Sequence, residues 1–85
     1  MLRKEVTIAK TKKMTAAPAA LLVQVANKFS SVVYVEQQEK QINAKSIMGV
    51  MTLKIFDGEV VTITANGEDE KEAVAEVEKL LTGEM

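Results

Sequence analysis

The stretch Asn43-Ala44-Lys45-Ser46-Ile47-Met48-Gly49-Val50-Met51 places a hydroxyl residue directly before a short, methionine-rich apolar run. A serine at such a junction can cap a helix, because its side-chain oxygen accepts hydrogen bonds from backbone N–H groups of the first turn. The same donors would receive a phosphate if that oxygen were esterified. A short helix starting at Ile47 would place Ile47, Val50 and Met51 on a common face. The stretch alone therefore leaves two interpretations of Ser46 open, a structural cap and a modification site.

Around this stretch the sequence alternates with the period of β-strands. In residues 2–9, Val6 and Ile8 face one way while Glu5 and Thr7 face the other. Residues 32–35 form a β-branched and aromatic run, and the polar residues 37–40 separate it from residues 41–43, which predicts a hairpin with a four-residue loop. Asp57-Gly58 is a turn signal, and the alternation in residues 60–65 predicts the last strand.

Two further helices are predicted from capping signals and apolar stripes. Thr15 suits the N-cap of a first helix, Pro18 is tolerated in its first turn, and Ser30-Ser31 ends it. In the last helix, Asp69-x-x-Glu72 resembles a capping box and Gly83 suits the C-terminal cap, with the acidic run 68–72 facing solvent. The stripes assigned to the core are Leu21, Leu22, Val25, Ala26 and Phe29 in the first helix, and Ala73, Val74, Val77, Leu80 and Leu81 in the last.

The order of these elements is strand, helix, strand, strand, short helix, strand, helix. This order predicts an α+β fold in which amphipathic helices cover one face of an antiparallel sheet. Residues 1–85 are expected to form a single domain, because a chain of 85 residues is too short for two.

Composition excludes most kinds of catalytic centre. The chain has no cysteine and no histidine, which removes disulfides, thiolate and imidazole metal ligands, cysteine nucleophiles, Ser-His-Asp constellations and phosphohistidine. The carboxylates lie mostly in the capping and solvent-facing run, and nothing pairs them with a nucleophile or base. We therefore expect a protein that is not an enzyme and needs neither a metal nor a cofactor.

Charge and hydropathy argue against nucleic acid and membrane as direct partners. Basic residues gather in residues 1–13 and acidic ones in residues 67–85, but the net charge is only −1 and the aromatic content is 4%, too low for a base-stacking platform. The apolar run after the basic N-terminus resembles a signal peptide only superficially, because it starts late and is interrupted by Pro18 and Gln24. It is also too short to span a bilayer. A cytoplasmic location is expected.

Three segments together resemble the HPr family, the small phosphocarriers of the bacterial sugar phosphotransferase system. They are the first-helix stretch 18–24, the stretch 43–51 quoted above, and Gly67-Glu68-Asp69-Glu70 at the start of the last helix. Lys-Ser-Ile-Met-Gly at 45–49 is the most specific of these. The resemblance implies an open-faced β-sandwich, a four-stranded antiparallel sheet covered on one face by three helices.

In the HPr family a histidine next to an arginine, at the start of the first helix, carries the phosphate. The matching positions in this chain are Thr15 and Ala17. A phosphothreonine is a comparatively stable ester, unlike the phosphoramidate of a phosphohistidine, so the chain is not expected to relay phosphate. The interpretation of Thr15 as a helix cap stands.

A missing histidine together with a retained serine resembles the catabolite-repression branch of the family, known as Crh. In that branch HPr kinase/phosphorylase modifies the serine matching Ser46, and the phosphorylated protein is the corepressor of catabolite control protein A. The resemblance assigns the partner contact to Lys45, Ile47, Met48 and Met51. Since the family arginine that Ala17 replaces also helps engage that regulator, Lys12, Lys13 or Lys45 is expected to supply part of the lost positive charge.

Three expectations remain to be tested. Methionines suit an adaptable contact surface, and we expect some of the side chains of Ile47, Met48 and Met51 to anchor the short helix while others stay exposed. Crh-like proteins can exchange their first strand between chains, so a homodimer is possible, with residues 10–13 as its polar hinge. The alternative function is a diverged or engineered HPr paralog that binds phosphotransferase-system partners without relaying phosphate.

Overall fold

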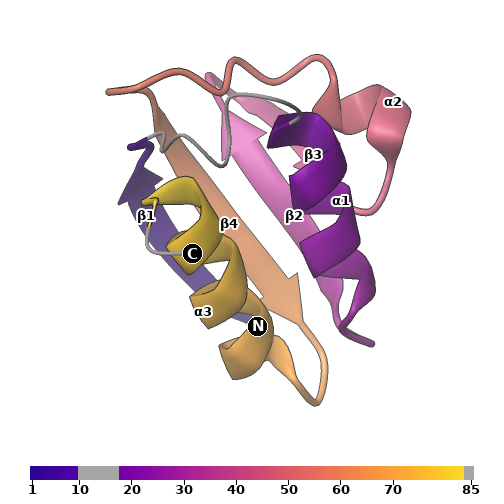
Figure 1. The fold of residues 1–85 in the computed structure, drawn as a ribbon. Helices are drawn as coiled ribbons and strands as arrows, with labels where there is room; N and C mark the ends of the chain where they lie inside the picture. The colour runs from indigo at the N-terminus through magenta and orange to yellow at the C-terminus, as the bar shows by residue number, and fades with distance from the viewer. Residues whose placement is uncertain (10–17, 84–85) are drawn as a thin grey trace.

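The computed structural model describes residues 1–9 and 18–83, which form a four-stranded sheet with three helices on one face (Figure 1). The strands are β1 (Leu2–Thr7), β2 (Val32–Gln37), β3 (Lys40–Asn43) and β4 (Val60–Asn66), and the helices are α1 (Pro18–Asn27), α2 (Ile47–Val50) and α3 (Glu70–Leu81). The strand order is β1-β4-β2-β3, and every neighbouring pair is antiparallel. The predicted α+β open-faced sandwich is confirmed.

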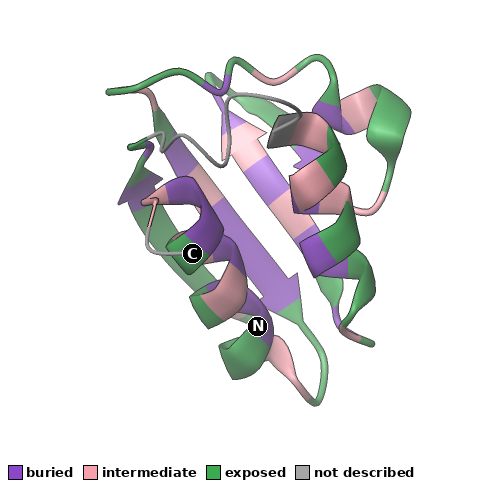
Figure 2. Ribbon diagram, in the orientation of Figure 1, coloured by how far each residue is buried: buried purple, intermediate pink, exposed green. Residues whose placement is uncertain are grey.

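The core lies between the sheet and the helices, as the alternation in the sequence predicts (Figure 2). Val6 and Ile8 are buried while Glu5 and Thr7 are exposed, and all five stripe residues of α3 are buried. The sheet contributes these further buried residues: Val33, Val35, Ile42, Val61, Ile63 and Ala65. α1 and α3 lie side by side over the sheet, and α2 lies at one corner beside α1 and β3.

The first helix ends earlier than predicted, whereas the C-terminal end of the last helix agrees with prediction. α1 ends at Asn27, whose side chain donates to the carbonyl of Val23 at 2.8 Å, and the predicted end at Ser30 is wrong. Phe29 consequently lies in the turn that follows and is only half-buried. Gly83 has the left-handed φ of 77° predicted for a C-terminal cap. The predicted N-cap Thr15 lies outside the described residues.

The hairpin between β2 and β3 is tighter than its polar sequence predicts. Gln37 pairs with Lys40, so only Gln38 and Glu39 form the turn, and the predicted four-residue loop is wrong. Both turn residues have positive φ, 49° and 69°, the conformation of a two-residue turn whose twist matches the strands. The strand extends to Gln37 because that side chain is buried and hydrogen-bonded, as described below.

The capping box predicted for the last helix does not form. Asp69 is the N-cap of α3, but its carboxylate makes no hydrogen bond to that helix. Glu70, rather than Glu72, reaches back and accepts from the backbone N–H of Gly67 at 3.1 Å. That hydrogen bond lowers the pKa of Glu70 below its ordinary value.

Within residues 1–9 and 18–83 the structure has no helix long and apolar enough to cross a membrane.

Candidate functional site

Ser46 stands at the N-cap of α2 with an extended backbone, φ −103° and ψ 113°. Its hydroxyl oxygen accepts from the backbone N–H of Gly49 at 3.4 Å, which confirms the predicted cap. This distance is long for an N–H···O bond, whose usual range ends near about 3.2 Å. The residue is exposed, so its side chain is accessible to solvent and only weakly held by the fold.

Gly49 and Val50 fix α2 against the sheet. A Cβ added at Gly49 would lie 3.1 Å from Cγ2 of Ile42 on β3, so the missing side chain permits a close approach. Val50 is fully buried and is the residue that anchors this four-residue helix. Val50 is the one residue of α2 in the core; Gly49 is half-buried, and Ile47 and Met48 are exposed.

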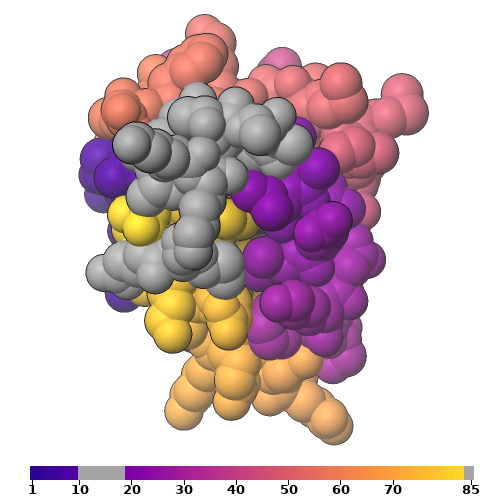
Figure 3. Space-filling model, in the orientation of Figure 1, coloured from indigo at the N-terminus to yellow at the C-terminus, as the bar shows by residue number. Residues whose placement is uncertain are grey.

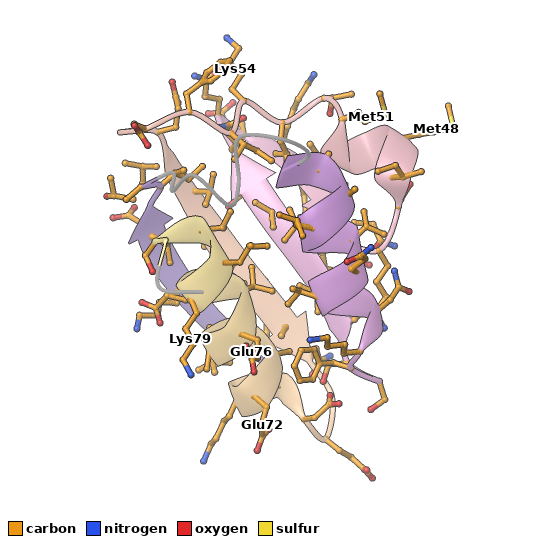
Figure 4. The ribbon with its side chains drawn as sticks, viewed as in Figure 1. Met48, Met51, Lys54, Glu72, Glu76 and Lys79 are labelled. Atoms are coloured by element: carbon orange, nitrogen blue, oxygen red, sulfur yellow. The ribbon has the colours of Figure 1, made fainter. Side chains whose placement is uncertain are left out.

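Ile47, Met48 and Met51 form an apolar patch on the outer side of α2, hereafter the α2 patch. Their exposed fractions are 45%, 80% and 70%. The expectation that some of the three anchor the helix is wrong, because all three are exposed and Gly49 and Val50 hold the helix instead. In Figure 4 Met48 points away from the body of the molecule at the corner that α2 forms. The patch is an uncovered apolar surface directly after Ser46.

Lysines and no acidic residues occupy the segment that carries Ser46. Residues 40–56 contain Lys40, Lys45 and Lys54 and neither aspartate nor glutamate. In Figure 3 the part of this segment around α2 forms the upper right corner of the molecule, beside α1. An added negative charge at Ser46 would therefore meet no like charge within its own segment. The sequence contains this signal, which the motif-based prediction did not use.

The ammonium group of Lys45 is already engaged. It donates to the backbone carbonyl of Phe29, just beyond the end of α1, at 2.7 Å, and the contact is partly buried. The backbone N–H of Lys45 donates to the side chain of Asn43 at 2.9 Å, which holds the approach to Ser46 in a turn. Lys45 thus ties the segment before α2 to the end of α1.

The same turn after α1 is held from its other side by Asp69. Its carboxylate accepts from the backbone N–H groups of Ser30 and Ser31, at 2.9 and 3.0 Å, and from the Ser31 hydroxyl. The Ser31 hydroxyl above all, and then the Ser30 amide, lower the pKa of Asp69 from 3.8 to about 2. The turn at residues 28–31 therefore joins the segment before α2 to the start of α3.

Gln37 holds the segment that follows α2. Its side-chain amide donates to the carbonyl of Lys54 and accepts from the N–H of the same residue, both at 2.9 Å. The side chain thus imitates a neighbouring strand and fixes residues 53–55 beside the hairpin. This contact could not be predicted from the local sequence, because its partners are 17 residues apart.

The structure brings together Lys45, Ser46 and the α2 patch among the predicted site residues. Thr15, Ala17, Lys12 and Lys13 lie outside the described residues. Within the described ranges, no group of three or more carboxylate, imidazole or thiol side chains could hold a metal ion.

Sequence comparison finds close relatives over nearly the whole chain. A family model described as the PTS HPr component phosphorylation site matches residues 2–83. The HPr-like protein Crh of Bacillus subtilis is 47% identical over 74 residues, which make up 87% of each chain.

Two solved structures share the architecture. The phosphocarrier protein HPr of Bacillus anthracis superposes with a TM-score of 0.86 at 40% identity, covering 95% of this chain and 96% of that one. Crh of B. subtilis superposes with a TM-score of 0.71 at 43% identity, covering 89% and 83%, and is reported as a dimer with a swapped domain.

Proposed function

The chain belongs to the HPr family, and from that premise we propose that it is a regulatory member switched by phosphorylation of Ser46. The modifying enzyme is HPr kinase/phosphorylase, and the phosphorylated protein acts as corepressor of catabolite control protein A in carbon catabolite repression. It works in the cytoplasm as a binding module and not as an enzyme. The observation that carries this proposal is the exposed Ser46 directly beside the uncovered α2 patch.

Electrostatics supports phosphorylation at this position. A phosphoserine adds roughly −1.5 to −2 charges and three strong acceptor oxygens. The 40–56 segment contains lysines and no acids, and the N–H of Gly49 already points toward the serine oxygen. Since the hydroxyl of Ser46 contributes one long hydrogen bond to the fold, the phosphate would change the surface without unfolding the domain.

The absence of histidine supports a role without phosphate relay. The family's phosphocarrier residue is a histidine, and this chain contains none. Thr15 and Ala17 occupy the positions of the family's histidine and arginine, and neither offers an imidazole. The chain therefore receives a regulatory phosphate at Ser46 and does not pass one on.

The α2 patch supplies the apolar part of the regulator contact. A patch of one isoleucine and two methionines is adaptable, because methionine side chains are flexible and polarizable. Lys45 is adjacent in sequence to the phosphate, but using it for the regulator would require releasing the carbonyl of Phe29. Lys12, Lys13 or Lys45 is the proposed source of positive charge toward the phosphate.

The test is intact-mass analysis after incubation with HPr kinase and ATP. Wild-type protein should gain one phosphate, and Ser46→Ala should gain none. Ser30→Ala is the matched control, since Ser30 is also an exposed serine but lies in the turn after α1; it should be phosphorylated like wild type. The proposal fails if wild-type protein stays unmodified while an ordinary HPr is phosphorylated in the same reaction.

Binding to the regulator is tested with the same samples. Phosphorylated wild type should bind purified catabolite control protein A, and unphosphorylated protein should not. Binding instead to enzyme I or to a permease domain, with none to the regulator, would favour the alternative function as a non-relaying HPr paralog.

We also propose that the chain forms a homodimer by exchanging β1. β1 is an edge strand whose backbone pairs with β4, Arg3 bonds Glu36 of β2 at 3.2 Å, and Lys4 ties it to Glu78 of α3 at 2.8 Å. A swapped β1 would make the same contacts in a partner. Light scattering after size-exclusion chromatography tests this, and a monomer at every accessible concentration would contradict it.

A further inference from the structure

Two strongly exposed side chains, one in α2 and one at its C-cap, are thioethers. Met48 and Met51 are three residues apart and are 80% and 70% exposed. The chain has five methionines and no cysteine, so no thiolate competes for an oxidant within it. Figure 4 shows both side chains at the corner formed by α2, which begins directly after Ser46. Two accessible sulfur atoms therefore lie in the surface that the proposed function uses for docking.

The fold does not depend on either sulfur. α2 is anchored by Val50, which is fully buried, and by the close approach of Gly49 to Ile42. Neither methionine belongs to the buried core or to the half-buried residues packed against it. A polar oxygen added to either sulfur would remain in solvent, so the modified chain keeps its structure and changes only its surface.

We propose that Met48 and Met51 form an oxidation-sensitive site at which a peroxide converts the α2 patch from apolar to polar. This inference rests on the proposed docking function of that patch. Each thioether sulfur attacks one oxygen of hydrogen peroxide, an S–O bond forms and the O–O bond breaks. The sulfur loses two electrons and becomes a sulfoxide, and the peroxide is reduced to one molecule of water.

The sulfoxide opposes docking because a partner would have to bury it. Burying an unpaired polar group costs free energy, while the reduced thioether contributes to binding when it is buried. Phosphorylation of Ser46 and oxidation of the patch therefore act in opposite directions on one surface. Methionine sulfoxide is reducible by methionine sulfoxide reductases, which makes this second modification reversible.

The matched control is the double variant Met48→Leu, Met51→Leu. Leucine keeps the patch apolar at similar volume and has no sulfur. The variant also retains the other three methionines, so it reports any effect of oxidation elsewhere in the chain. Tryptic cleavage after Lys45 and Lys54 releases residues 46–54, which carry Ser46 and both methionines in one peptide.

The experiment treats wild type and variant with hydrogen peroxide, with and without phosphorylation. The wild-type peptide 46–54 should gain one oxygen per methionine, and Tm should change by less than about 3 °C because the core is untouched. Affinity of the phosphorylated wild type for catabolite control protein A should fall by at least about tenfold. Whatever the variant's own starting affinity, peroxide treatment should change it by less than about twofold, and sulfoxide reductase should restore the affinity of the oxidised wild type.

Retention on a hydrophobic-interaction column provides a readout independent of the regulator, and oxidation should lower it for wild type but not for the variant. Unoxidised methionines in peptide 46–54, or unchanged wild-type retention, would overturn the oxidation site. Equal loss of affinity in wild type and variant would overturn its role in docking. If the unoxidised phosphoprotein failed to bind the regulator, the proposed function would fall, and column retention would still decide whether the patch changes polarity.

Discussion

The two side chains at the N-caps of α2 and α3 behave differently. The hydroxyl of Ser46 bonds within its own helix, through one contact of 3.4 Å to the backbone N–H of Gly49, and the residue is exposed. Asp69 makes no side-chain bond to its own helix and instead binds the turn after α1 through three donors. One cap is local and weak, and the other joins two distant parts of the chain.

The difference indicates which position can accept a modification. A side chain that holds the tertiary structure cannot be changed chemically without weakening the fold. A side chain that closes only its own short helix can be esterified at little cost to stability. Under the proposed function, stability thus depends on the tertiary cap at Asp69 and regulation on the local cap at Ser46, and the following variants test that division.

The largest effect is expected at Gly67, which packs against Ser31, one of the residues that Asp69 binds. A Cβ at this position would lie 2.5 Å from Oγ and 2.7 Å from Cα of Ser31. Gly67→Ala should lower the free energy of unfolding by about 3 kcal/mol, measured by urea denaturation. Gly58→Ala is the control, since Gly58 has a φ of 88° but nothing within 4 Å of an added Cβ. That variant should lose only about 1 kcal/mol, the cost of the backbone conformation, and equal losses would refute the packing argument.

Asp69→Asn should have the next largest effect. The substitution replaces the charged carboxylate that accepts hydrogen bonds from Ser30 and Ser31 with a neutral amide. Tm should fall by about 5 to 10 °C at pH 7. The folded pKa of Asp69 is lowered from 3.8 to about 2, so its stabilisation is complete above the unfolded value and is lost as pH falls through this interval. Thermal melts should therefore show the difference from wild type shrinking between pH 4 and pH 2.

Glu68→Gln is the control for this pH dependence, because Glu68 is an exposed neighbouring carboxylate. Its Tm should follow that of wild type across the whole range. A difference between Asp69→Asn and wild type that stays constant down to pH 2 would show that the carboxylate charge is not what holds the turn.

Lys45→Met should have a smaller effect, because one bond and not three is lost. The substitution keeps an unbranched side chain but removes the donor to the carbonyl of Phe29. Unfolding free energy should fall by about 1 kcal/mol. Lys40→Met is the control, because Lys40 is an exposed lysine of the same segment. Its free energy of unfolding should stay within about 0.5 kcal/mol of the wild-type value. Equal losses would indicate a general charge effect.

Ser46→Ala should be the mildest change to the fold. Since the capping contact is long, we expect a loss of about 0.5 kcal/mol, at the low end for serine caps. Chemical denaturation of the two proteins in parallel provides the measurement. A loss at Ser46 as large as that at Asp69 would remove the distinction between local and tertiary caps.

The features that could be predicted from the sequence are those that depend on residues close together in the chain. The stripe of α3 and the alternation of β4 follow from spacing alone, and the cap at Ser46 was predictable because its partner is three residues away. The partners of Asp69 were not predictable, because Ser31 lies 38 residues away and the local pattern favoured a capping box. Hydrogen bonds between residues so far apart in sequence depend on how the helices and strands pack against one another.

The candidate site was predictable in position but not in detail. The motif located Ser46 and the apolar residues Ile47, Met48 and Met51. Whether an apolar residue in a four-residue helix is buried depends on which side meets the sheet, so Val50 could not be separated from Met51 by spacing. The engagement of Lys45 with Phe29 also needed the three-dimensional structure.

The contact between Gln37 and Lys54 has a consequence for variation at this surface. Gln37 recognises only the backbone of residue 54, through one N–H and one carbonyl, and leaves the lysine side chain exposed. The identity of residue 54 is therefore free to diverge while its position stays fixed. Glutamate at position 37 would lose the donor and repel the carbonyl, so the contact requires the glutamine amide at position 37. The side chain at position 54 can therefore change the surface of the molecule while the backbone beneath it stays fixed by Gln37.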